Sequence, residues 1–249
     1  MFPLRDENPT LSAPVSTVAI VVLNIAAWFL LQGAGGEPLL TRSVCSFGLI
    51  PGELLGLAPD GLQVRVGPAS VCEIHHASAN LLSPVVSMFL HGGWFHLLGN
   101  MWFLWVFGNN VEDSMGRVRF VVFYLLCGLA AAAAQTMANP SSPIPMVGAS
   151  GAIGGVMGAY ASLYPGARVD MLIVLGFYVT RASVPAVVVL GYWFLLQVLG
   201  GLPSIAAEGG GVAFWAHVGG FASGYVLSFV FRNPARVAAH RRALGGFAR

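Results

Sequence analysis

The chain has 249 residues, of which 56% are hydrophobic and only 9% are charged. Ordinary soluble domains carry about 25% charged residues, so this composition excludes a typical water-soluble domain and is that of a membrane protein. The formal net charge is only +2, and contact with anionic lipid explains the basic C-terminal stretch RNPARVAAHRR, so no nucleic-acid partner is expected.

Six apolar windows are long enough, or nearly so, to cross about 30 Å of hydrocarbon as helices. They cover residues 14–32, 93–111, 118–138, 149–164, 183–202 and 212–231. Polar residues and glycines interrupt each window, which predicts a bundle with a polar interior. The apolar run 169–179 is too short to span and is expected to be an interfacial or re-entrant piece. We therefore expect an all-α integral membrane protein with a cytoplasmic segment at 1–13, a six-helix domain at 14–232 and a basic cytoplasmic tail at 233–249.

The orientation of this bundle follows from its charges. The first window is preceded by MFPLRDENP, which is not net positive as a signal peptide would be, so a retained helix is expected. All 12 basic residues are arginine. Six spans with an inner N terminus leave Arg42 and Arg65 outside and all the others inside. The positive-inside rule therefore predicts that both termini are cytoplasmic.

A long loop, 33–90, separates the first two windows and lies outside in this topology. Its stretches SFGLIPGELLGL and LLSPVVSMFL are apolar enough to form short interfacial helices in the outer leaflet. Cys45 and Cys72 fall in this loop and could pair in an oxidising compartment, with two free thiols as the alternative. Cys72 lies close to His75 and His76, but no spacing completes a four-ligand set, so no metal site is expected.

One serine, Ser150, lies among small residues in the stretch MVGASGAIGGVMGAY at the head of the fourth window. Its hydroxyl could cap a helix, pack against a neighbour or act as a nucleophile. Small faces in the fourth and sixth windows would let two helices approach closely and bring the Ser150 hydroxyl to His217, as in an activated nucleophile. The glycines that form these faces are Gly151, Gly154, Gly155, Gly158, Gly220 and Gly224.

Two further polar residues lie in the second window. His96 and Asn100 are four residues apart, so they project from one face of a helix. An unpaired polar group in hydrocarbon is energetically costly, so these side chains and His217 are interpreted as candidate functional residues. Packing and interhelical hydrogen bonding are the alternatives.

The sequence resembles the rhomboid family of intramembrane serine proteases over essentially the whole chain after Leu11. HGGWFHLLGN in the second window, GASG in the fourth and AHVGG with a following ASG in the sixth match the family in its order. The resemblance implies a six-helix rhomboid-like bundle with Ser150 as nucleophile and His217 as its base, without an acidic third member. It also implies an oxyanion site formed by His96, Asn100 and backbone amides at Ser150 and Gly151.

Four residues are expected to support the site: His91, Glu112, Gly220 and Gly224. His91 would brace the loop before the second window. Glu112 matches a structural glutamate of the family, and with Asp113 it would pair with Arg117 or Arg119.

The sequence departs from some rhomboids at Gly154, where those proteins carry an aromatic residue that stacks on the catalytic imidazole. Another feature must then orient His217. Tyr160, Tyr225 and tight glycine packing are the candidates.

The function implied by the resemblance is an intramembrane serine endopeptidase of a bacterial inner membrane that cleaves transmembrane segments of other membrane proteins near the outer face. Substrates would carry a locally unstable helix and a small residue at the scissile bond. No metal or organic cofactor is implied, and homo-oligomerisation stays open. The alternatives are a catalytically inactive rhomboid relative that binds and escorts membrane proteins, which the retained Ser150 and His217 disfavour, and a transporter, which the lack of a charge pair in the spans disfavours.

Overall fold

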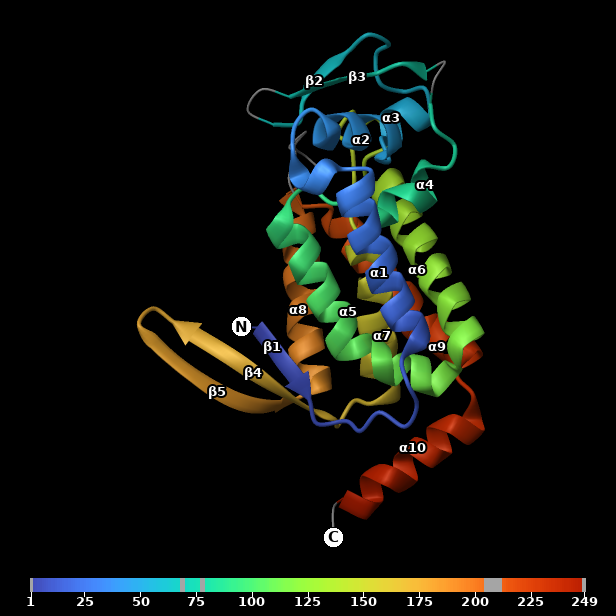
Figure 1. The fold of residues 1–249 in the computed structure, drawn as a ribbon, viewed down its shortest axis with the longest axis vertical. Helices are drawn as coiled ribbons and strands as arrows, with labels where there is room; N and C mark the ends of the chain where they lie inside the picture. Colours follow the sequence, from blue (N-terminus) through green and yellow to red (C-terminus); the bar gives the residue numbers. More distant parts are fainter. Residues whose placement is uncertain (1, 68–69, 77–78, 204–211, 248–249) are drawn as a thin grey trace.

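The structure is a computed structural model that describes residues 2–67, 70–76, 79–203 and 212–247. Long helices run between an upper cap and a lower end that carries a small sheet and the helix α10 (Pro234–Phe247) (Figure 1). The expected tail is therefore helical over most of its length. Its last two residues, including Arg249, lie outside the described residues.

One helix corresponds to each of the six apolar windows, and α5 extends four residues beyond its window. The helices are α1 (Val15–Leu30), α5 (Trp94–Met115), α6 (Arg117–Ala138), α7 (Ser150–Leu163), α8 (Ala186–Gly201) and α9 (Phe214–Phe231). Among the described helices, α6 and α9 are both long and apolar enough to cross a membrane, while α1 and α8 are apolar but shorter. Length and composition thus support two membrane-crossing helices, and the six-span topology stays a prediction.

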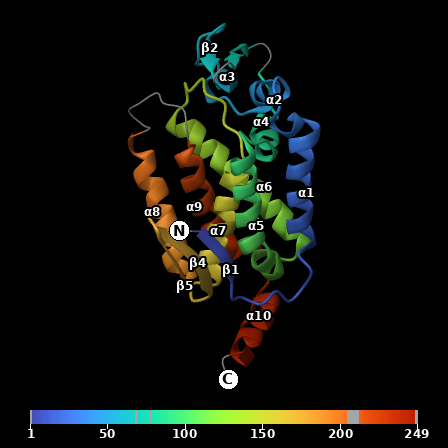
Figure 2. The same ribbon diagram turned by 60° about the vertical axis from the view of Figure 1, so that its left-hand side comes forward.

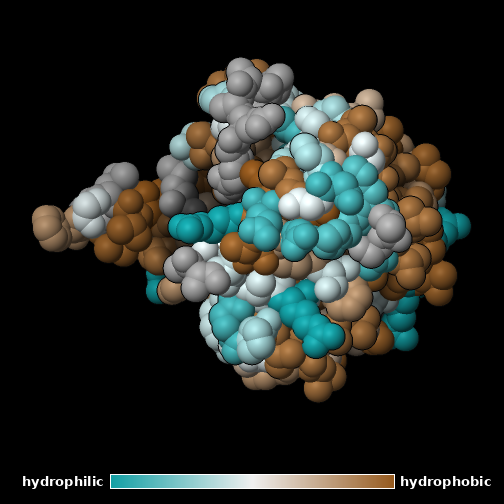
Figure 3. Space-filling model, turned by 90° about the horizontal axis from the view of Figure 1, so that it is seen from above, coloured by the Kyte–Doolittle hydropathy of each residue, from teal (hydrophilic) through white to brown (hydrophobic). Residues whose placement is uncertain are grey.

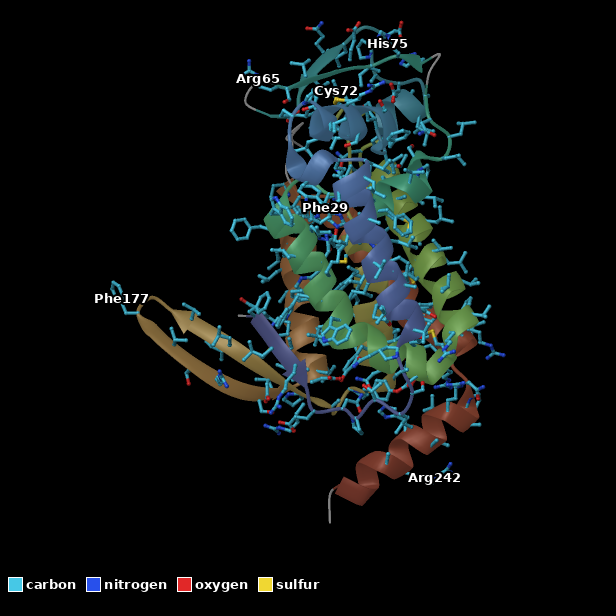
Figure 4. All side chains as sticks on the ribbon, viewed as in Figure 1. Phe29, Arg65, Cys72, His75, Phe177 and Arg242 are labelled. Atoms are coloured by element: carbon cyan, nitrogen blue, oxygen red, sulfur yellow. A yellow bond between two sulfur atoms is a disulfide. The ribbon has the colours of Figure 1, made fainter. Side chains whose placement is uncertain are left out.

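Large apolar side chains are exposed along the flanks of the bundle. Examples are Leu30 of α1, Val118 and Met137 of α6 and Val230 of α9, each more than 70% exposed. Viewed from the cap, the molecule has a hydrophilic centre with hydrophobic residues around much of its edge (Figure 3). In the side view of Figure 4, Arg65 and His75 lie in the cap, Arg242 lies at the lower end and Phe29 lies on the bundle between them. An apolar surface this extensive is typical of contact with lipid.

The cap is formed by loop 33–90 and is more structured than predicted. It contains η1 (Gly33–Gly35), α2 (Leu39–Phe47), α3 (Pro51–Leu54), β2 (Gln63–Arg65), β3 (Val71–Glu73), α4 (Ser83–Val86) and η3 (Ser87–Phe89). The short helices were expected, whereas the β2–β3 hairpin was not. A disulfide between Cys45 and Cys72 joins α2 to β3, so these cysteines are not free thiols. Leu49 and Met146 exchange backbone hydrogen bonds, which fix the cap to the loop before α7.

The all-α expectation needs correction, because residues 169–179 lie in a β-hairpin, whereas the interfacial position of this run stays a prediction. Strands β4 (Arg168–Leu175) and β5 (Tyr178–Pro185) pair around a turn with Gly176 at φ +60°. The N-terminal strand β1 (Phe2–Asp6) adds to β4, which gives the order β1-β4-β5. The hairpin projects from the bundle with Phe177 at its tip (Figure 4). Valine and isoleucine favour a pleated strand, so the fold is mainly but not wholly helical.

Candidate active site

The helix that begins with Ser150 is the centre of the bundle. All but two of the 14 residues of α7 are buried. Helices α5, α6 and α9 pack around it, and α8 lies against α9 on the other side (Figure 2). Its many buried glycine and alanine residues have small side chains, so several helices can pack closely against different faces of α7.

The expected close approach of α7 and α9 is present. A Cβ atom on Gly220 would lie 2.0 Å from the carbonyl oxygen of Gly151, and one on Gly224 would lie 2.0 Å from that of Gly155. Such distances are too short for any side chain. The two backbones are therefore in direct contact, and glycine is required at both positions of α9.

This contact brings Ser150 and His217 together from helices that are distant in sequence. Ser150 is the first residue of α7, and His217 lies in the first turn of α9. Ser150 Oγ and His217 Nε2 are 2.8 Å apart, which is hydrogen-bond distance. Serine and an imidazole nitrogen at this distance have the geometry of a nucleophile and its base.

The imidazole of His217 is oriented by two residues of α8 that were not singled out from the sequence. Gln197 Oε1 lies 2.8 Å from His217 Nδ1, and the Trp193 ring centroid lies 5.7 Å from that of the imidazole. The tyrosines considered from the sequence have other positions. Tyr160 donates its hydroxyl hydrogen to a carboxylate of β1, and Tyr225 is exposed.

His96 lies beside the serine, next to the first glycine of GASG. Gly148 has φ +127°, and a Cβ atom there would lie 2.7 Å from His96 Nε2 and 3.6 Å from Ser150 Oγ. The backbone N–H of Gly92 donates to His96 Nδ1 at 3.3 Å. Because Nδ1 accepts this hydrogen bond, a neutral His96 ring carries its hydrogen on Nε2. Nε2 is the ring nitrogen on the side of Gly148. A donor therefore lies beside the nucleophile.

Asn100 lies one helical turn beyond His96 and is buried. Within the described residues, its amide nitrogen has no hydrogen-bond partner. A buried donor without a partner is costly, which indicates that the group serves a ligand or water. Asn100 is not among the described residues that line the cavity next to Ser150, and its place in the oxyanion site stays a prediction.

A cavity of about 760 Å³ opens beside the serine, between the cap and the upper ends of the helices. His96, Ser150, Gly151 and His217 line it on the helix side, and Glu37, Thr41 and Arg65 of the cap line it on the other. This volume is in the range of ligand pockets, and the polar side chains in the mixed lining, such as Glu37 and Thr41, allow water to reach the serine.

His91 lies in the loop before α5, where it is completely buried. Its backbone N–H donates to Gln32 Oε1 at 2.8 Å, and its carbonyl accepts from Gln32 Nε2 at 2.7 Å. Its ring lies edge-on to that of His96 at 5.2 Å. His91 thus fixes the segment that leads to His96.

Glu112 has different partners from those expected. Its carboxylate accepts hydrogen bonds from the backbone N–H groups of Ser16 and Thr17 at 2.9 and 2.8 Å and from the Thr17 hydroxyl at 2.8 Å. Asp113 accepts from the backbone N–H groups just before α1. Glu112 therefore caps the N terminus of α1, where negative charge is favoured, and Asp113 fixes the segment before it. Neither forms the expected pair with Arg117 or Arg119.

No group of three or more histidine, cysteine, aspartate or glutamate residues in the described parts of the chain could hold a metal ion. Cys72, considered with His75 and His76, is taken up by the disulfide.

Comparison with known proteins identifies the family. Residues 79–234 match the model of the rhomboid domain. RHOMBOID-like protein 1 of Arabidopsis thaliana is 29% identical over 223 residues, which cover 86% of this chain and 52% of the relative. Rhomboid protease GluP of Bacillus subtilis is 29% identical over 231 residues, which cover 93% of this chain and 38% of the relative. The chain thus spans about half or less of the length of these relatives. Because the domain model matches more than half of the sequence, the chain belongs to the rhomboid family, whose members are integral membrane proteins.

Proposed function

We propose that this rhomboid protein is an intramembrane serine endopeptidase with Ser150 as its nucleophile and His217 as its general base. The observation that carries the proposal is the 2.8 Å distance between Ser150 Oγ and His217 Nε2 at the wall of the cavity. A neutral imidazole in this place takes the serine proton during attack on a peptide carbonyl and returns it to the leaving amine. The Bacillus subtilis relative that is named a rhomboid protease supports this class of activity.

Attack by the serine creates a tetrahedral oxyanion that needs hydrogen-bond donors. His96 Nε2 would supply one, and the first backbone N–H groups of α7, which have no acceptor within the helix, would supply others. The positive end of the α7 dipole favours the same charge. Asn100 would join them through its free amide nitrogen, directly or through water.

The proposed topology has six spans with both termini in the cytoplasm of a bacterial cell. Arg42 and Arg65 lie in the cap, whereas the other arginines of the described residues lie on, or directly after, elements at the lower end of the bundle. The positive-inside rule then puts the cap outside. The disulfide of the cap suits an oxidising compartment. The upper ends of α5, α7 and α9 carry the proposed site, which would lie near the outer face.

The proposed substrates are transmembrane segments of other membrane proteins. A peptide in regular helix hides its carbonyl groups, so a segment must unwind before Ser150 can reach one. Segments with a locally unstable helix and a small residue at the scissile bond would meet this condition most easily.

The test is cleavage of a model transmembrane substrate in liposomes by the wild type, Ser150→Ala and the control Ser162→Ala, which removes another hydroxyl from α7. We expect fragments from the wild type and the control and none from Ser150→Ala. Cleavage by Ser150→Ala would show that the nucleophile is wrong. If no variant cleaves although the substrate binds, the protein is the inactive binding factor that was the alternative from sequence.

A further inference from the structure

We infer that Gln197 of α8 is a positioning residue, whose side-chain carbonyl holds His217 in the tautomer and orientation that Ser150 requires. This inference rests on the proposed function, because a base must present a lone pair to its nucleophile. It assigns a role to a residue outside the rhomboid motifs of the sequence.

The tautomer follows from the two partners of the imidazole. His217 Nε2 lies 2.8 Å from Ser150 Oγ, and His217 Nδ1 lies 2.8 Å from Gln197 Oε1. A neutral imidazole has a hydrogen on one nitrogen and a lone pair on the other. Because a carbonyl oxygen only accepts, the hydrogen must be on Nδ1. The lone pair is then on Nε2, where it can take the serine proton.

The same contact serves the charged state of the base. When Nε2 takes the proton from Ser150, the ring of His217 becomes positive, and Gln197 Oε1 accepts a stronger, charge-assisted hydrogen bond from Nδ1. A carboxylate would stabilise this cation more strongly. However, burying a carboxylate beside a neutral imidazole would incur a large desolvation cost. Glutamine provides an acceptor without adding a charge.

Helix α8 holds the ring of His217 in a second way. Trp193, one helical turn before Gln197, has its ring inclined by 38° to the imidazole at a centroid distance of 5.7 Å. Trp193 thus packs beside the face of the imidazole, and Gln197 fixes the direction of its Nδ1 atom. On the α7 side, a Cβ atom on Gly154 would lie 3.2 Å from the carbonyl oxygen of His217 and 3.8 Å from the Trp193 ring, so the aromatic ring beside the base comes from α8 and not from α7.

A glutamine in an apolar helix could also serve only to pack α8 against α9. The two roles differ in their effect on the pH profile, because only a partner of the imidazole changes its protonation. Among the described residues, His96, Glu37 and Arg65 are the titratable side chains that line the cavity with His217, and all three are unchanged in the variants compared.

The experiment compares wild type, Ser150→Ala, Gln197→Leu, Gln197→Glu and Leu199→Ala, the last being a control at an exposed position of α8. Cleavage in liposomes is measured across the pH range, together with the rate at which a fluorophosphonate labels Ser150, which needs no substrate. We expect Gln197→Leu to lower kcat and the labelling rate by about 10- to 100-fold with little change in KM. Gln197→Glu should move the acid limb of both profiles to higher pH, because a carboxylate favours the protonated ring. The control should match the wild type.

The outcomes separate this inference from the proposed function. If the wild type cleaves, Ser150→Ala does not, and both Gln197 variants keep the wild-type rate and profile, the inference is overturned while the proposed function stands. If Gln197→Leu does not fold, an unshifted profile for Gln197→Glu is sufficient to overturn it. A wild type that neither cleaves nor labels at Ser150 overturns the proposed function and this inference with it.

Discussion

The carbonyl oxygen of Gly151 lies 2.0 Å from the place where a Cβ atom would be on Gly220. Both sides of this contact are backbone, so a methyl group at Gly220 must move α9 away from α7. A displacement of about 1 Å in a catalytic group can lower the rate by about 10²-fold. We therefore expect Gly220→Ala to reduce kcat/KM for a model substrate by roughly that factor, because His217 moves away from Ser150.

The control for this variant is Gly191→Ala in α8, where an added Cβ atom meets nothing within 4 Å. It introduces the same side chain into a helix without disturbing a contact, so its activity should equal that of the wild type. Equal losses in the two variants would contradict the importance of the α7–α9 contact.

Removal of the donor beside the serine is expected to slow the chemical step. His96→Ala should lower kcat by about 10²- to 10³-fold with little change in KM, because oxyanion donors act mainly in the transition state. Steady-state kinetics in liposomes measures both constants. His75→Ala, which removes an exposed imidazole in the cap, is the matched control. A rise in KM without a fall in kcat would mean that His96 binds substrate instead.

The cap on α1 predicts an effect on stability. Glu112→Gln keeps one acceptor oxygen but loses the charge at the N terminus of α1. A hydrogen bond to a charged group contributes about 1.5–3 kcal/mol, so the free energy of unfolding should fall by a similar amount. Unfolding by heat or denaturant in detergent would show the loss, with Glu73→Gln at an exposed position of β3 as control. An unchanged free energy of unfolding would show that Glu112 does not stabilise α1.

The N-terminal strand predicts a dependence of stability on pH. Asp6 of β1 lies outside the spanning helices, and its Oδ2 atom accepts from Tyr160 Oη and Asn110 Nδ2, each at 2.6 Å. Burial raises the pKa of Asp6 from 3.8 to about 6. Between about pH 4 and about pH 6 the folded protein then binds more protons than the unfolded chain, so the free energy of unfolding falls as the pH rises. The contribution of Asp6 to the free energy of unfolding is therefore largest below about pH 4 and is lost as the pH rises above about 6, the pKa of Asp6 in the folded protein.

Asp6→Asn tests this dependence, because the amide oxygen can accept the same hydrogen bonds but cannot ionise. We expect the variant to unfold at a higher temperature than the wild type at pH 7.5 and to show a smaller change between pH 7 and pH 5. Asp60→Asn in the cap should behave as the wild type. If the unfolding temperature of Asp6→Asn depends on pH as strongly as that of the wild type, Asp6 is not the group responsible.

The helices were predictable because the 20-residue length of a span and the breaks around it are local properties. The window 149–164 matches α7, for example. The window 93–111 ends four residues before α5 does, because the polar residues that follow it, such as Glu112, are buried against α1. The β1–β4 pair was missed because Arg5 and Asp170 become neighbours only in the folded chain. The roles of Ser150 and His217 could be predicted from the motifs that contain them. Gln197 had a signal of its own, since a polar residue in an apolar helix needs a partner, but its partner depends on how α8 packs on α9.

The most direct test of the account is to map the site of fluorophosphonate modification by mass spectrometry in the purified wild type and in His217→Ala. We expect a phosphonyl group on Ser150 of the wild type and almost none on the variant, since the hydroxyl needs its base. Modification at another serine, or equal modification of Ser150 without His217, would contradict this expectation.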